Sequence, residues 1–409
     1  MAEISTLGYS KRPNNPFHAS LGDSITANGI AGSSASSVTA SSRNWGQWAA
    51  SMSGRRFAHV ATIGTGGYRT DQIITDLLPL MLSKTAQNGN AFPTPGRVSV
   101  LAGTNNMGQI GGTDSYGRTI TIATTLTDLQ TIYNQLLAAG MTPIACALTP
   151  RNDIVDNIMK LNAGIAQLAA QMGLLFVDFY NGCVDPTTGG LASGYNISGD
   201  SVHPNATGAK AMGQILANAL NFLPVSLPDL RYQNNNIMWA NSLFLTDVGG
   251  DGIPDGWSGN INGHATPSIL SGESGIIGNA FAITMTDNVA GATFPRSPTL
   301  AAVPGDWVAF TVKLSYAPAG TTPSGAVYLK QLSPSPGNTF AGFDLSNVAS
   351  PAVPPVSTGG YIDLYKVIRV PAGATTGVGV EMAASGTGSV LKIAQCGAYN
   401  LTAMGLAVL

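Results

Sequence analysis

Short apolar runs alternate with amphipathic stretches through the first half of this 409-residue chain. Residues 143–148 and 174–179 have the length and composition of buried parallel strands. Residues 126–139 and 154–172 repeat apolar side chains at helical spacing. This alternation predicts an α/β domain in which helices cover both sides of a parallel sheet.

The pattern changes after Leu223, where helical periodicity disappears. A chain of this length is too long for one ordinary core. We expect an amino-terminal extension over residues 1–15, the α/β domain over 16–225 and a linker over 226–234. Short β-like runs between Gly, Pro and Asn turns predict an antiparallel, jelly-roll-like β-sandwich over 235–409. These runs are residues 280–285, 307–314, 326–332, 361–370, 377–382 and 390–394.

The tetrapeptide Gly22-Asp23-Ser24-Ile25 follows an apolar run at residues 17–21. Ser24 is therefore expected at the carboxyl end of a strand, where open α/β sheets bind their ligands. Gly-Asp-Ser is also an ordinary turn, and serine is an ordinary helix cap. The tetrapeptide gains meaning only together with other segments.

Two further polar segments follow strand-like runs. Residues 62–67, after the run 57–61, contain three glycines that can turn the backbone sharply and present bare N–H groups. The run 98–102 leads into Gly103-Thr104-Asn105-Asn106, where Asn105 can point an amide donor into a cleft. Each segment alone is equally consistent with a loop or a turn.

An aspartate and a histidine stand three residues apart in Asp200-Ser201-Val202-His203. On a tight turn the carboxylate of Asp200 can hold one ring nitrogen of His203 while the other nitrogen faces a cleft. Asn205 or Thr207 can cap the helix-like run 206–220. A capping turn with an exposed histidine would have the same sequence.

Taken in this order, the four segments resemble those of the SGNH (GDSL-type) hydrolase family over residues 15–225. The resemblance implies a three-layer α/β/α, flavodoxin-like domain with a parallel sheet. It also implies a catalytic triad of Ser24, Asp200 and His203. His203 would take the proton of the serine hydroxyl, and Asp200 would fix the ring tautomer.

The same resemblance implies an oxyanion hole made by the N–H groups of Ser24 and Gly67 and the side-chain amide of Asn105. Two positions depart from the family pattern. Asn106 stands where aspartate is common, and Thr62 stands where asparagine is frequent. Neither departure replaces a catalytic atom, but both can alter loop packing.

Only 10% of the residues are charged and the formal net charge is −2, whereas about 25% are charged in average proteins. Without a cluster of Lys and Arg, nucleic acid is not an expected partner. Residues 1–17 lack the apolar core of a signal peptide, and no run of about 18 apolar residues predicts a membrane span. A surface of uncharged polar residues suits an extracellular or virion-associated protein that handles carbohydrate.

The cysteines are odd in number and scattered, so we expect buried residues rather than disulfides. They are Cys146, Cys183 and Cys396. The histidines outside the candidate triad stand apart, with no pair at metal-ligand spacing, so we expect structural or surface roles and neither metal nor other cofactor. They are His18, His59 and His264.

Residues 241–257 resemble the opening strand of jelly-roll carbohydrate-binding modules. Three aspartates there, Asp247, Asp251 and Asp255, are spaced like calcium ligands in Asp-Gly loops. Calcium needs six to eight oxygens, so a structural turn is the simpler interpretation. Three tryptophans can stack on sugars or fill the core. They are Trp239, Trp257 and Trp307.

We therefore interpret the chain as a serine esterase that removes O-acetyl groups from a carbohydrate or polysaccharide, in a phage tail or a secreted enzyme. One alternative is a lipase, lysophospholipase or thioesterase of the same fold. Another is a non-catalytic glycan-binding tail protein. The sequence leaves open the sugar, the acetylated position, the acyl-chain preference and the oligomeric state.

Overall fold

The computed structural model describes residues 15–30, 38–227, 241–258, 261, 263–289, 295–299, 301–320, 323–331, 339–345, 360–371 and 378–405. The described chain divides into two compact units. The first contains residues 15–30, 43–49 and 59–226. The second contains residues 38–42, 50–58 and the described residues from 227 onward.

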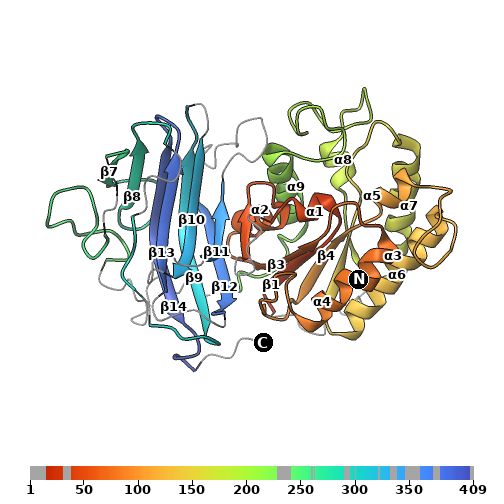
Figure 1. Cartoon of the computed structure of the whole chain (residues 1–409), viewed down its shortest axis with the longest axis horizontal. Helices are drawn as coiled ribbons and strands as arrows, with labels where there is room; N and C mark the ends of the chain where they lie inside the picture. The colour runs from red at the N-terminus through yellow and green to blue at the C-terminus, as the bar shows by residue number, and fades with distance from the viewer. Residues whose placement is uncertain are drawn as a thin grey trace. The chain divides into compact units, whose positions relative to one another are not determined.

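A five-stranded sheet in the order β3-β1-β4-β5-β6 forms the middle of the first unit (Figure 1). The pairs β1–β4, β4–β5 and β5–β6 are parallel. The predicted α/β architecture is therefore confirmed. The strands are β1 (Phe17–Gly22), β3 (Ala58–Gly64), β4 (Arg97–Leu101), β5 (Thr142–Cys146) and β6 (Leu175–Val177).

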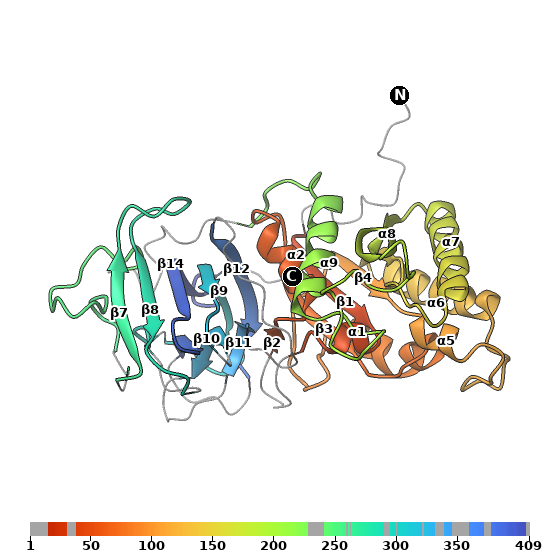
Figure 2. The same ribbon diagram turned by 90° about the horizontal axis from the view of Figure 1, so that it is seen from above.

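Helices lie on both faces of this sheet (Figure 2). On one face, Trp45 of α2 meets Phe179 of α8 edge-on, with ring centroids 5.4 Å apart. Gly213 of α9 packs so tightly that a Cβ there would lie 2.4 Å from Cβ of Trp48. The other face carries α3, α4, α6 and α7. The helices are α1 (Ser24–Ala27), α2 (Trp45–Met52), α3 (Thr70–Gln72), the π-helix η2 (Ile73–Leu77), α4 (Leu78–Ser83), α5 (Thr104–Gly108), α6 (Ile122–Ala138), α7 (Val155–Met172), α8 (Phe179–Cys183) and α9 (Ala206–Ala219).

Local sequence explains where the two long predicted helices begin and end. Thr121 and Thr124 form a reciprocal capping box, in which each side chain accepts the other's backbone N–H, so α6 begins four residues before the predicted start. Helix α7 ends at Gly173, which adopts φ +64°. That left-handed conformation favours glycine and stops the helix.

The strand order reverses its direction of winding at β1. From β1, the second strand of the sheet, the chain moves to β3 on one side and then to β4 on the other. The carboxyl ends of these three strands therefore surround a topological switch point, where open α/β sheets bind ligands.

One strand from the amino-terminal half belongs to the second unit. Strand β2 (Val38–Ser41) lies between α1 and α2 in sequence. It pairs in parallel with β11 (Thr339–Asp344), for example Thr39 with Gly342. Neither this strand nor its pairing was predicted from the sequence.

The second unit contains two sheets with the strand orders β13-β10-β11-β2 and β12-β9-β14-β8-β7. All neighbouring strands of the second sheet pair in antiparallel fashion, as predicted. The two sheets pack face to face. A Cβ added to Gly325 of β10 would lie 2.6 Å from the ring of Tyr316 of β9. The remaining strands are β7 (Ala265–Leu270), β8 (Ala280–Met285), β9 (Trp307–Ala317), β10 (Ser324–Gln331), β12 (Ile362–Arg369), β13 (Val378–Ser385) and β14 (Val390–Asn400).

Aromatic residues fill one end of this second unit. Trp257 is 8% exposed and packs edge-on against Phe244 and Phe281. It therefore belongs to the core and does not offer a ring to a sugar. Trp239 lies outside the described residues, and Trp307 is half-buried.

The three candidate calcium aspartates are engaged with the backbone of their own loop. Asp247 accepts N–H bonds from Gly250 and Gly252, at 2.8 and 2.9 Å. Asp251 and Asp255 each accept one further backbone N–H. Within the described residues, no three His, Cys, Asp or Glu side chains converge as a metal site. The structure therefore shows a hydrogen-bonded turn.

Candidate active site

Ser24 is the first residue of α1, directly beyond the carboxyl end of β1. Gly22, two residues earlier, has to be glycine because a Cβ there would lie 2.3 Å from the carbonyl oxygen of Leu101. Asp23 caps α1 by accepting the N–H of Ile25. The strand, the glycine and the cap together turn the chain so that Ser24 lies at the switch point of the sheet.

Ser24, His203 and Asp200 form one hydrogen-bonded line. Nε2 of His203 lies 2.8 Å from Oγ of Ser24, and Nδ1 lies 2.6 Å from Oδ2 of Asp200. A carboxylate only accepts hydrogen bonds, so the ring proton belongs on Nδ1. Nε2 is then free to accept the serine proton. The structure therefore brings together the three residues selected from the sequence.

The carboxylate of Asp200 is held in its ionised form. Its Oδ1 accepts the backbone N–H groups of Val202 and His203, at 2.7 and 3.1 Å. Burial alone would raise the pKa of Asp200, but these bonds and the contact with the His203 ring lower it below its usual value.

Asn205 fixes the turn that carries both residues. Its side-chain oxygen accepts the N–H of Gly208 and so caps α9, while its amide donates to the carbonyls of Gly194 and Asn196. Asn196 in turn donates to the carbonyl of Asp200. Of the two caps considered from the sequence, the structure uses Asn205.

The two other candidate oxyanion donors follow the neighbouring strands. Gly67 lies beyond β3 with φ +78°, and nothing lies within 4 Å of where its Cβ would be. Asn105 lies beyond β4, whose Leu101 pairs in register with Gly22. Its Nδ2 donates one hydrogen to the carbonyl of Tyr68 at 2.9 Å. An amide nitrogen has two hydrogens, so the second remains for another acceptor.

Residues 20–211 match the sequence model of the GDSL-like Lipase/Acylhydrolase family. This part of the chain belongs to that hydrolase family. The resemblance stated from the four sequence segments is therefore confirmed. No curated protein matches the chain in sequence.

Solved structures similar to this chain cover about half of it. A member of the lipolytic protein G-D-S-L family from Veillonella parvula is 18% identical, covers 51% of this chain and 99% of its own, and gives a TM-score of 0.37. The acetylxylan esterase Axe2 from Geobacillus stearothermophilus is 14% identical, with 51% and 94% covered and a TM-score of 0.38. A GDSL-like lipase from Bacteroides thetaiotaomicron is 19% identical, with 50% and 87% covered and a TM-score of 0.36. These similarities do not indicate which substrate this chain acts on.

The first departure from the family pattern, Asn106 of α5, is bonded to Thr70 at the start of α3. Its Oδ1 accepts the N–H of Thr70, and its Nδ2 donates to Oγ1 of Thr70, both at 3.0 Å. Asn106 is 2% exposed and Thr70 is fully buried. Helix α3, which follows β3, is thereby tied to α5, which follows β4.

The second departure, Thr62 of the edge strand β3, is half-buried and belongs to a row of hydrogen-bonded polar side chains. Its hydroxyl lies 2.8 Å from Nε2 of His59 and accepts a bond from Asn44. Nδ1 of His59 lies 3.1 Å from Nδ1 of His18, whose Nε2 lies 2.8 Å from Oγ of Ser99. His18 and His59, which stand apart in sequence, are thus neighbours in the fold.

These buried histidines are structural. Burial, aided by the charge of Arg97, lowers the pKa of His18 to about 3, so its ring is neutral. His264 instead lies in the second unit, 2.6 Å from Asp287. The three cysteines are free and buried, as predicted.

Asp23 is a buried acid beside the candidate nucleophile that the sequence analysis did not select. Its Oδ1 caps Ile25, whereas its Oδ2 is buried without a hydrogen-bond partner. Burial raises the pKa of Asp23 to about 7, although the Ile25 N–H and the charge of Arg151 oppose the shift. The carboxyl next to Ser24 is therefore largely neutral below pH 7.

A pocket of ≈ 280 Å³ opens beside the triad of the GDSL-like domain, with Asp200 in its wall. Its lining is mostly polar or glycine, although ligand pockets are usually lined by apolar side chains. The side chains in its wall include Asn152, Thr188, Leu191, Asn196 and Ser201.

Among the helices of the described residues, none is both long and apolar enough to cross a membrane.

Proposed function

We propose that this GDSL-family hydrolase is a serine esterase with Ser24 as nucleophile, His203 as general base and Asp200 as the residue that orients the base. The observation that carries the proposal is the continuous line from Asp200 through His203 to Ser24, with contacts of 2.6 and 2.8 Å. A serine hydroxyl becomes an effective nucleophile only when an adjacent base removes its proton during attack.

The reaction would proceed through an acyl-enzyme. His203 takes the hydroxyl proton as Oγ of Ser24 attacks the ester carbonyl, and the ionised Asp200 stabilises the imidazolium. His203 then gives the proton to the departing alcohol. Water, activated by the same ring, releases the acid and restores Ser24.

Negative charge on the carbonyl oxygen would be met by three donors, the N–H groups of Ser24 and Gly67 and the amide of Asn105. The bond from Asn105 to the carbonyl of Tyr68 supports this role, because it fixes the amide before the substrate arrives. Donors fixed in advance stabilise a transition state without the cost of reorganisation.

We extend the proposal to an acetyl ester of a carbohydrate. The polar pocket beside Asp200 offers hydrogen-bonding groups to an alcohol rich in hydroxyls. Its ≈ 280 Å³ is near the lower limit of about 300 Å³ for pockets that hold drug-sized ligands, which suits a compact ring. The low content of charged residues, 10%, also favours an uncharged substrate.

We further propose that the β-sandwich unit keeps the esterase near polymeric substrate, outside a cell or on a virion. Tethering raises the local substrate concentration without any new catalytic contact. The paired sheets of the second unit supply a separate body for that role.

The test compares wild type with Ser24→Ala on 4-nitrophenyl acetate, 4-nitrophenyl octanoate and an acetylated polysaccharide. Ser193→Ala, at an exposed loop serine, is the matched control. We expect Ser24→Ala to lose activity while its circular dichroism is unchanged, and acetyl esters to react faster than octanoyl esters. Full activity of Ser24→Ala would refute the mechanism, and faster cleavage of the octanoyl ester would favour the lipase alternative.

A further inference from the structure

Helix α5, which carries Asn105, is joined to the start of α3, which follows the turn of Gly67, by a buried pair of hydrogen bonds. Asn106, the neighbour of Asn105, bonds the N–H and the hydroxyl of Thr70, three residues after Gly67. Between them, Asn105 donates to the carbonyl of Tyr68. The relative position of the two candidate oxyanion donors therefore depends on this junction.

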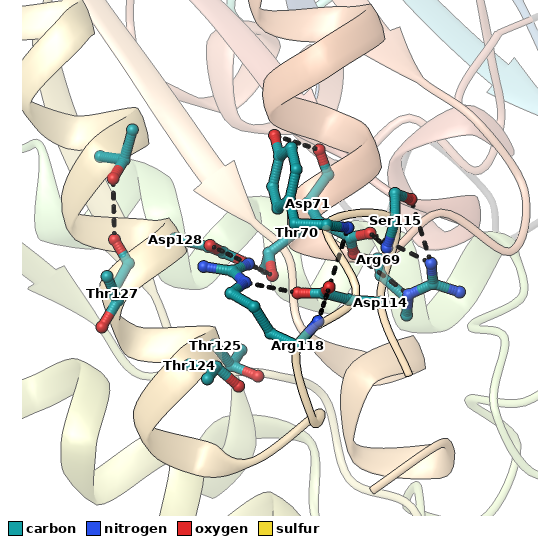
Figure 3. Close-up of polar contacts among 12 residues, drawn as sticks. Arg69, Thr70, Asp71, Asp114, Ser115, Arg118, Thr124, Thr125, Thr127 and Asp128 are labelled. Carbon is teal, nitrogen blue, oxygen red and sulfur yellow. Dashed lines mark hydrogen bonds and ion pairs between the residues drawn. The ribbon is translucent and has the colours of Figure 1, made fainter. Parts of the chain in front are cut away.

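The junction continues as a chain of bonds with one direction. Nδ2 of Asn106 donates to Oγ1 of Thr70, and that hydroxyl donates its single hydrogen to Oδ2 of Asp128 at 2.8 Å. Oδ1 of Asp128 accepts from Arg118 at 2.8 Å, and Arg118 also contacts Asp114 at 2.7 Å. Figure 3 shows Thr70, Asp128, Arg118 and Asp114 in this arrangement.

The direction of the chain explains why an asparagine suits position 106. Asp128 is 3% exposed and only accepts hydrogen bonds, so Thr70 must donate to it. The hydroxyl can then only accept from position 106. A carboxylate at position 106 would need the same hydrogen, and one of two buried carboxylate oxygens would lose its partner, which is destabilising.

We propose that Asn106, Thr70 and Asp128 form a positioning relay that holds the turn of Gly67 and helix α5 with Asn105 in a fixed relative position, with Arg118 fixing Asp128. This inference rests on the proposed function, because it assigns the relay's effect to the donors Gly67 and Asn105. The three residues act through those donors and do not touch substrate.

The relay can be reversed without changing the net charge. In Asn106→Asp with Asp128→Asn, Thr70 donates to the carboxylate introduced at position 106 and accepts from the amide introduced at position 128. The amide oxygen at position 128 still accepts from Arg118. Each single variant breaks one bond of the relay, whereas the double variant restores all of them in the opposite direction.

The experiment measures kcat and KM on 4-nitrophenyl acetate for both single variants and the double variant. We expect each single variant to lower kcat about 10-fold with KM little changed, which is less than the 10²–10³-fold loss on deleting an oxyanion donor. The double variant should recover to within about threefold of wild type, since residues in one hydrogen-bond network couple strongly. Adding Thr70→Val should abolish the recovery.

If the losses of kcat in the two single variants simply add in the double variant, the relay is overturned. Variants that change only KM or only the melting temperature would also overturn it. If Asn106→Asp does not fold, recovery of folded protein and turnover in the double variant still tests the reversal. Ser24→Ala in the same assay separates the two proposals. Loss of turnover in Ser24→Ala without coupling between positions 106 and 128 refutes the relay alone, whereas turnover retained by Ser24→Ala refutes the proposed function.

Discussion

Nε2 of His203 lies 2.8 Å from Oγ of Ser24, although 179 positions separate the two residues in the chain. Ser24 follows β1, the first strand of the sheet in sequence, and His203 precedes α9, the last helix of the first unit. The fold therefore joins the two ends of the domain at one crevice.

Asp200→Asn should be more damaging than Asp200→Ala. The N–H groups of Val202 and His203 would hold the oxygen of the amide introduced at position 200, so its NH₂ would face Nδ1 of His203. Two donors cannot bond, and the ring would move its proton to Nε2, where it could no longer accept from Ser24. We expect kcat to fall about 10⁴-fold in Asp200→Asn and less in Asp200→Ala. The reverse order would show that the backbone bonds do not set the amide orientation.

Asn105→Ala should lower kcat by about 10²–10³-fold and change KM little. The reason is that its amide would bind the oxyanion more strongly than the ground-state carbonyl. Steady-state kinetics on an acetyl ester check this, with the exposed Asn181→Ala of α8 as control. A rise in KM at constant kcat would place Asn105 in substrate binding.

Asp23→Asn should change how stability depends on pH. The folded pKa of about 7 exceeds the ordinary 3.8, so the unfolded chain loses this proton first as pH rises. The Asp23 contribution to stability is complete below about pH 4 and is lost as pH rises towards 7. Asparagine keeps the cap on Ile25 and cannot ionise. Urea unfolding should show that the free energy of unfolding of Asp23→Asn rises relative to that of wild type between pH 4 and pH 8. A difference in this free energy that does not depend on pH would contradict this assignment.

Asn152→Ala combined with Thr188→Ala should impair polysaccharide deacetylation selectively. Both side chains line the pocket beside Asp200, and one hydrogen bond is worth about 0.5–1.5 kcal/mol, or about 2- to 12-fold. We expect kcat/KM to fall by that factor on an acetylated oligosaccharide and to stay constant on 4-nitrophenyl acetate. Thr187→Ala, outside the lining, is the control. Equal losses on both substrates would remove the pocket from sugar recognition.

A chain ending at Val225 should be less stable than the full chain. Strand β2 pairs with β11, which the truncation removes. An unpaired strand exposes N–H and C=O groups that promote association. Size-exclusion chromatography and thermal unfolding should show aggregation or a lower melting temperature. A monomeric truncated chain with unchanged melting temperature and ester turnover would show that β2 does not need its partner.

The local pattern of the sequence determined most of the first unit. Runs of apolar residues specified β4 and β5 to within a residue or two at each end, because each strand is buried on both faces. Helical spacing specified α6 and α7, whose ends follow from the Thr121 capping box and from Gly173. Ser24, Gly67 and Asn105 could be selected because each comes soon after a strand of the parallel sheet, whereas Asp200 and His203 were selected from their spacing on a turn before α9.

Tertiary structure decided what depends on partners far away in sequence. Strand β2 is only four residues long and becomes a strand because β11, about 300 positions later, offers its edge. His18 and His59 become neighbours because β1 and β3 lie side by side. The direction of hydrogen bonding at Asn106 is set by Asp128 and Arg118, and the raised pKa of Asp23 is set by burial. Sequence patterns report the preferences of a segment for helix, strand and burial, whereas pairing, proton placement and dielectric surroundings arise only when segments meet in space.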